Sequence, residues 1–140
     1  MARLTWAIAC QRILLDQQTN MMSYIDALDG ISLPVFPIMA PPIFVGTLWE
    51  REGEAQIEVQ VKAYAPDGAI LGTAVSEPLR FRPEHQRGRV NVVLAGIVLP
   101  AAGRYEFGIE IRDKKKWVEV NRIPFQVEQA VPGAQGKLLV

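Results

Sequence analysis

The stretch that decides the fold is Glu54–Tyr64, which reads EAQIEVQVKAY. Its apolar side chains recur at every second position, and polar or charged side chains occupy the positions between them. A period of two is typical of a β-strand with one face on a core and the other in water. The stretch therefore predicts a half-buried strand whose inward residues are Ala55, Ile57, Val59, Val61 and Ala63.

The same alternation occurs on both sides of this stretch. Arg104–Arg112 (RYEFGIEIR) repeats it, while Arg89–Leu99 (RVNVVLAGIVL) is apolar on both faces, which predicts a central strand. Leu4–Cys10 (LTWAIAC) alternates with its larger side chains in phase. A bulge near Gln11 and Arg12 would explain why the next apolar residues are out of phase.

Turn-forming segments separate these stretches, and no part of the chain has a convincing helical period. Arg51–Glu54, Pro66–Gly68 and Arg112–Trp117 are examples of such connections. The pattern predicts about eight strands in an all-β, antiparallel Greek-key β-sandwich, of the immunoglobulin-like or C2-like kind.

The stretch LPAAGRYEF has the spacing of a tyrosine corner, with Leu99, Gly103 and Tyr105 at the start of a strand. In such a corner the tyrosine hydroxyl bonds to the backbone of the preceding loop and fixes the crossover between two sheets. We therefore predict a structural role for these three residues.

Length and composition favour one domain in a reducing compartment. The 140 residues predict a single β-sandwich domain over 1–127, followed by a C-terminal tail over 128–140 where the alternation is lost. A formal net charge of zero gives no general field to attract nucleic acid or an anionic membrane. The apolar run before Cys10, the one cysteine, is too short for a signal peptide, so we expect a cytoplasmic protein without a membrane span.

Most of the chain resembles a family of small bacterial single-domain proteins of unknown function. The resemblance covers roughly residues 3–127 and is carried best by the opening segment Leu4–Leu28, by Pro34–Pro37 (PVFP) and Phe44–Trp49 (FVGTLW), and by Gly103–Ile111. It implies a single β-sandwich. It implies no activity, cofactor or catalytic residue.

Few residues suit catalysis or metal binding. Cys10 and His85 are the one cysteine and the one histidine, and the alternation predicts that Cys10 is a buried small hydrophobe. Asp26 and Asp29 could converge with other loop aspartates on calcium, although aspartates are also common in turns. We therefore expect no catalytic, cofactor or metal site.

Two basic clusters are candidates for binding nucleic acid. The arginines around one loop are diluted by glutamates; they are Arg80, Arg82, Arg87 and Arg89. The lysine turn Lys114–Lys116 is typical of a soluble hairpin. Neither is sufficient to predict binding of nucleic acid. Tight closure of that turn pairs Arg112 with Trp117 on the outer face, where Trp117 forms a cation–π pair or anchors an interface.

The segment Leu33–Ile43 (LPVFPIMAPPI) is apolar, uncharged and contains four prolines. Prolines exclude a helix and a central strand, so the segment must be an extended crossover. Its apolar side chains either cap the core or face a partner. We expect the partner-binding residues to be Val35, Phe36, Ile38, Met39 and Trp117, with Phe36 as the outward anchor.

These observations favour a non-catalytic protein–protein interaction module or assembly subunit, with a protein partner or a second copy of the chain. A C2-like domain that binds a ligand, calcium or a membrane surface is one alternative. An enzyme with a site in the loops at one end, using Asp26, Asp29 or His85, is the other.

Overall fold

The computed structural model describes residues 1–130 and 137–139, and every regular element in this part of the chain is a β-strand. The strands are β1 (Arg3–Leu15), β2 (Met22–Ala27), β3 (Gly30–Leu33), β4 (Ile38–Met39), β5 (Ile43–Glu50), β6 (Gln56–Ile57), β7 (Val59–Tyr64), β8 (Ile70–Val75), β9 (Leu79–Arg80), β10 (Arg87–Leu94), β11 (Val98–Leu99), β12 (Gly103–Asp113), β13 (Lys116–Gln129) and β14 (Lys137–Leu139). The all-β class predicted from the sequence is confirmed. Within the same residues no helix has the length and apolar character needed to cross a membrane.

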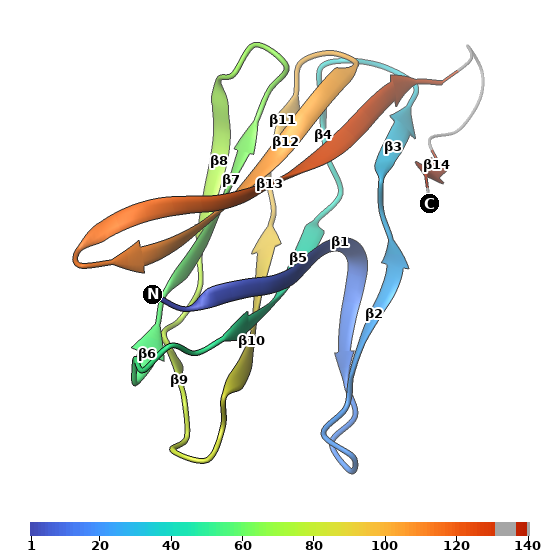
Figure 1. The fold of residues 1–140 in the computed structure, drawn as a ribbon. Coiled ribbons are helices and arrows are strands. Elements are labelled where there is room, and N and C mark those ends of the chain that lie inside the picture. The colour runs from blue at the N-terminus through green and yellow to red at the C-terminus, as the bar shows by residue number, and fades with distance from the viewer. Residues whose placement is uncertain (131–136, 140) are drawn as a thin grey trace.

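Two larger sheets make up most of the fold (Figure 1). The four-stranded sheet has the order β10-β5-β1-β2, and the six-stranded sheet has the order β14-β3-β13-β12-β7-β8. Strands β3 and β13 run parallel, whereas the other described pairs are antiparallel. The described sheets are thus antiparallel and mixed, and their order does not confirm the expected Greek-key sandwich of about eight strands.

Side chains from both larger sheets are buried in one hydrophobic cluster. The inward residues predicted from the deciding stretch belong to this cluster, apart from Ala55, which is exposed before β6: they are Ile57, Val59, Val61 and Ala63. The inward face of β12 is buried as predicted, with Phe107 and Ile109 in the same cluster. Removal of this apolar surface from water is the main stabilising contribution to the fold.

β1 changes its partner at Cys10, because residues 3–10 pair with β5 and residues 10–15 pair with β2. Figure 1 shows β1 curving over at this point, so that the β1–β2 hairpin runs away from the rest of the sheet. The predicted bulge near Gln11 and Arg12 is wrong, since the register of β1 with β2 is continuous there. The apolar residues of β1 change phase because the strand leaves β5 at Cys10 and continues in a hairpin with β2.

The register shift of β1 lies between Leu4 and Trp6, in its pairing with β5. The expectation that the larger residues of this stretch share one face is therefore wrong. Leu4 packs against the main core, whereas the Trp6 ring contacts Tyr24 of the hairpin, with centroids 5.2 Å apart. The outer face of the four-stranded sheet thus has an apolar layer of its own beneath the hairpin.

β10 is the end strand of the four-stranded sheet, so the prediction of a central strand for residues 89–99 is wrong. Its inward residues Val90 and Val92 are buried in the core. On its outer face, Val93 is 44% exposed, and Asn91 accepts a hydrogen bond from the Tyr24 hydroxyl. The second apolar face of this stretch reflects partial cover by the hairpin, which the sequence pattern cannot distinguish from a neighbouring strand.

The tyrosine corner has the predicted hydrogen bond. The hydroxyl of Tyr105 donates to the carbonyl oxygen of Ala101 at 2.5 Å, and the Tyr105 side chain is buried. Gly103 has a φ of 150°, and a Cβ there would lie 2.8 Å from Pro66 Cγ. The loop therefore approaches the turn after β7 too closely for a side chain, which explains the glycine.

The C-terminal segment returns to the six-stranded sheet. β13 extends to Gln129, two residues beyond the domain end predicted at 127, and β14 pairs antiparallel with β3. The rest of the predicted tail, 131–136 and 140, lies outside the described residues. The division into a domain and a tail stays a prediction.

Candidate functional site

The proline segment splits its side chains between the core and the surface. Phe36 is half-buried and packs against the core, and Ala40 is buried. Val35 and Met39 face outward and are 57% and 62% exposed. The expectation of Phe36 as the outward anchor is therefore wrong, because the segment uses its aromatic ring as a cap.

Short strand pairing holds this segment in place. Met39 of β4 lies opposite Val98 of β11, and the backbone N–H of Ala40 donates to the carbonyl of Ile97 at 2.8 Å. Val98 is also exposed. We call Val35, Met39 and Val98 the proline surface. It lies at the end opposite the tip of the β1–β2 hairpin (Figure 1).

Trp117 lies opposite Arg112 in the β12–β13 hairpin, as the sequence predicts. The guanidinium of Arg112 is 6.0 Å from the centroid of the Trp117 ring and also pairs with Glu58 at 3.1 Å. The pairing expected from a tight turn continues only as far as Glu110, because a bulge between Ile109 and Glu110 shifts the register of β12 with β13 beyond it. Trp117 is thus half-buried by a contact within its own hairpin.

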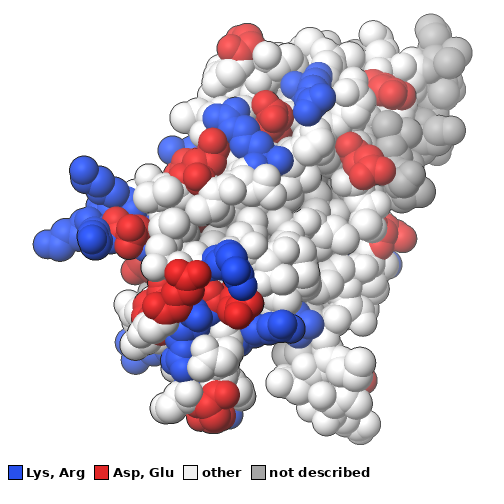
Figure 2. All heavy atoms as spheres, viewed as in Figure 1, with Lys and Arg blue, Asp and Glu red and all other residues white. Residues whose placement is uncertain are grey.

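A groove of about 490 Å³ lies beside the β1–β2 hairpin. Figure 1 shows that the hairpin tip and the β9–β10 loop project from the same end, and Figure 2 shows the molecule hollowed between the two lobes. We call this feature the hairpin groove. Among its lining residues are Leu15, Met22, Leu48, His85, Arg87 and Arg89.

Alternation along β10 brings two arginines to one side of the groove. Gly88 faces β9, where a Cβ would lie 2.4 Å from Leu79 and 2.9 Å from Phe81. Because strand side chains alternate, Arg87 and Arg89 both lie on the opposite face. Gly88 therefore lets β10 approach β9 closely, while the guanidinium groups of Arg87 and Arg89 share the other face.

The other side of the groove depends on how the hairpin docks. The ring of Tyr24 lies over Gly46 of β5, where a Cβ would be 2.2 Å from the ring carbon Cε1. The Tyr24 hydroxyl donates to Asn91 Oδ1 at 3.2 Å, and the Trp6 ring meets the Tyr24 ring edge-on. The hairpin is therefore anchored through one aromatic side chain on a glycine, and Met22 is positioned beside it.

The groove carries uncompensated positive charge. Arg87 and Arg89 make no ion pair with any residue of the described part of the chain. Glu50, the β5 partner of Arg87, pairs its carboxylate with Arg3 instead. Burial raises the pKa of the Tyr24 phenol, and the positive charge of Arg89 partly opposes this effect. The guanidinium of Arg89 therefore acts on the face where the hairpin docks.

The predicted catalytic and metal candidates are not brought together. Cys10 is fully buried beneath the hairpin, and burial raises the pKa of its thiol, whereas His85 is exposed in the loop before β10. Asp26 is exposed near the end of β2, and Asp29 is exposed in the turn that follows it. Across residues 1–130 no group of three or more His, Cys, Asp or Glu side chains is close enough to hold a metal ion.

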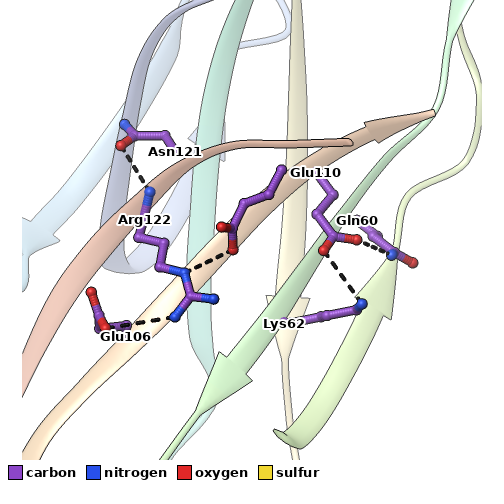
Figure 3. A network of polar contacts seen from close by, with 7 residues as sticks. Gln60, Lys62, Glu106, Glu110, Asn121 and Arg122 are labelled. Atoms are coloured by element: carbon purple, nitrogen blue, oxygen red, sulfur yellow. Dashed lines mark hydrogen bonds and ion pairs between the residues drawn. The ribbon is translucent and has the colours of Figure 1, made fainter. Parts of the chain in front are cut away.

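Several charged side chains on the outer face of the six-stranded sheet pair with one another (Figure 3). Glu110 accepts a hydrogen bond from Gln60 Nε2 at 2.5 Å and lies 3.3 Å from Lys62 Nζ. Arg122 pairs with Glu119 at 2.8 Å. The sequence predicts that Gln60 and Glu110 face water, yet both side chains are buried. Their mutual hydrogen bond compensates for the loss of contact with water.

Sequence reasoning identified the arginines and His85 but missed the apolar part of the groove. Leu15, Met22 and Leu48 come from three different strands, and only the docked hairpin brings them together. Gly46 and Gly88, single glycines inside strand patterns, are the available signals, because such glycines often mark a close approach of another segment.

The chain was compared with models of known protein families. The model of the Family of unknown function (DUF6941) matches residues 5–128, so the chain belongs to this family. The match agrees with the resemblance seen in the sequence over residues 3–127. No curated protein matches the chain.

Proposed function

We propose that this member of the family is a non-catalytic protein-interaction module, and that the proline surface is its main contact. The observation that carries the proposal is the exposure of Val35 and Met39 on a segment held by strand pairing, with the exposed Val98 opposite Met39. Exposed apolar patches are typical of partner surfaces. Prolines on both sides of β4 restrict the unbound segment, which reduces the entropy lost on binding.

The remaining predicted contacts have smaller roles in this proposal. Phe36 supports the surface from beneath, Ile38 is half-buried within it, and Trp117 acts as a secondary contact. We propose a Greek-key β-sandwich of the immunoglobulin-like or C2-like kind as the scaffold. The hydrogen bond of Tyr105 and the cluster shared by the two larger sheets support this. We also propose a cytoplasmic location, which suits a chain whose one cysteine is a free, buried thiol.

The test compares two pairs of exposed apolar residues. Val35→Ser/Met39→Ser removes the proline surface, and Ile70→Ser/Val75→Ser, on β8, is the matched control. Circular dichroism and melting first establish that both variants fold. We expect the first variant alone to lose a partner captured from the source cell, or its own dimer mass in light scattering, with binding at least about tenfold weaker.

Two results would contradict the proposal. Equal retention, or equal loss, in the two variants would remove the contact from the proline surface. A rise in melting temperature with millimolar calcium chloride would favour the C2-like alternative, because a ligand that binds only the native state stabilises it.

A further inference from the structure

The hairpin groove joins positive charge to apolar surface. Arg87 and Arg89 form one side, and Leu15, Met22 and Leu48 lie across from them or between. Other arginines of the chain are also without an ion pair among the described residues, but they do not line this groove. A ligand with charge alone would leave the apolar side chains uncovered, and a purely apolar ligand would bury the arginines unpaired.

The size and shape of the groove suit a short length of extended chain. Its volume of about 490 Å³ lies within the range of ligand-binding clefts. A strand-like segment places alternate side chains on opposite sides, so carboxylates could face β10 while apolar residues face the hairpin. Bidentate pairing of guanidinium with carboxylate would add directionality.

A flat anionic membrane fits this end of the molecule poorly. Asp16 lies at the hairpin turn, where its carboxylate accepts backbone N–H groups from Gln18 and Thr19, and Glu84 is exposed in the β9–β10 loop. Figure 2 shows acidic atoms at the end of the lobe that this loop forms. These carboxylates would meet anionic headgroups before Arg87 and Arg89, which lie in β10 behind the loop.

Nucleic acid fits poorly for a different reason. Proteins that hold single strands offer aromatic side chains for stacking of the bases. The described lining residues of the groove include no Phe, Tyr or Trp, and its apolar part is aliphatic. The same carboxylates at the two tips would also oppose the phosphates of a duplex.

We infer that the hairpin groove binds an extended acidic segment of a partner protein, in which aspartate or glutamate alternates with aliphatic residues. The carboxylates pair with Arg87 and Arg89, and the aliphatic side chains cover Leu15, Met22 and Leu48. The groove is separate from the proline surface, so either site can fail without the other.

The experiment selects a phage-displayed library of random linear peptides on the full chain. An enriched peptide is then labelled and its binding measured by fluorescence polarisation. We expect it to alternate acidic and aliphatic residues. Binding to the Arg87→Ser/Arg89→Ser variant should be about tenfold weaker, which corresponds to two partly exposed ion pairs. The matched Arg80→Ser/Arg82→Ser variant should bind like wild type.

A second pair of variants varies only the sign of one charge. Leu15 is about half exposed, so either charged residue can be accommodated there. Leu15→Glu should weaken binding of the acidic peptide, and Leu15→Lys should preserve or strengthen it. This pair keeps the test decisive if the arginine variant does not fold.

Several outcomes would overturn the inference. Enrichment of peptides without acidic residues, or no enrichment at all, would do so, as would equal loss in the two arginine variants. Sedimentation of the chain with phosphatidylcholine–phosphatidylserine vesicles, lost in Arg87→Ser/Arg89→Ser, would assign the groove to a membrane instead. Binding of an oligonucleotide with the same loss would assign it to nucleic acid.

Discussion

The outer faces of the two larger sheets share one local feature, a tyrosine ring packed on a strand glycine, but differ in how the ring is held. On each face a tyrosine ring lies over a glycine: Tyr24 over Gly46 on the four-stranded sheet, and Tyr64 over Gly108 on the six-stranded sheet. Covering a strand glycine with an aromatic ring protects the backbone that the glycine leaves bare. The two rings differ in what holds them.

Side chains of the sheet itself hold the Tyr64 ring. The guanidinium of Arg122 lies 4.1 Å from its centroid and is also paired with Glu119 and Glu106. The Tyr24 ring belongs to a separate hairpin and is held by that hairpin's path through the fold. On the six-stranded sheet, the charged side chains around the ring thus pair with one another, whereas the four-stranded sheet is covered by a chain segment that leaves a groove beside it.

The largest effect should come from Gly46, and Gly108 is the residue to compare with it. Gly46→Ala would push a methyl group into the Tyr24 ring, which the hairpin prevents from moving, at a cost of about 2–3 kcal/mol in the free energy of unfolding. Gly108→Ala meets the carboxylate end of Glu119 and the edge of Tyr64, which can shift, so it should cost less than about 1 kcal/mol. Urea unfolding measures both.

The double variant Gly46→Ala/Tyr24→Ala is the control for this difference. If the clash with the ring is the cause, removal of the ring should recover most of the loss that Gly46→Ala adds. Equal costs for the two single glycine variants would show that the hairpin is no more tightly held than the Tyr64 side chain.

A smaller loss of stability is expected when charged residues of the six-stranded sheet are removed, and it should be greater for a buried residue than for an exposed one. Glu110→Ala would leave the buried Gln60 amide without its partner, at a cost of about 1–3 kcal/mol in the free energy of unfolding. Arg122→Ala should cost less than Glu110→Ala, because its ion pairs are exposed and screened by water. A greater loss for Arg122→Ala in the same urea titration would contradict this ranking.

The smallest effect concerns pH and the groups beneath the hairpin. Burial raises the pKa of Cys10 above its ordinary 9.0 and that of Tyr24 above 10.0, so both are protonated more readily in the native state than in the unfolded chain. Their contribution to stability is complete below about pH 9 and is lost as pH rises through the native pKa values.

Unfolding measured from pH 8 to 11 should therefore show a decline in stability that Cys10→Ala and Tyr24→Phe each make less steep. A third variant, Ser23→Ala, changes an exposed residue of β2 and should leave the decline unchanged. The same slope in all four proteins would show that neither group is linked to folding.

The sequence predicted the strands of the six-stranded sheet better than those of the four-stranded sheet. β7 and β12 each have their apolar residues on the core face, so the alternation predicts these core residues correctly, although it misses the burial of Gln60 and Glu110 on the other face. In β1 and β10 both faces carry apolar residues, because the hairpin covers the second face. A period of two cannot tell cover by a folded-back segment from cover by a neighbouring strand.

The candidate sites show a similar limit. The pairing of Arg112 with Trp117 follows from a short turn and could be predicted. The groove is lined by residues such as Leu15 and Arg89, which are far apart in the chain, and no local sequence pattern predicts that they line one groove. The predicted outward orientation of Phe36 is wrong, because the sequence shows that a residue is apolar but not whether its side chain in a crossover points to the core or to solvent.

The parallel pairing of β3 with β13 has a consequence for the order of folding. Gly30 aligns with Gln126, so β3 can enter the six-stranded sheet only after β13 has been synthesised. Contacts between such distant residues slow folding, since a long loop must close before they form. During synthesis, Ile31 and Leu33 therefore stay without their strand partners while β1, β2 and β5 can already pair. We expect chaperones to bind these exposed apolar residues mainly in this interval.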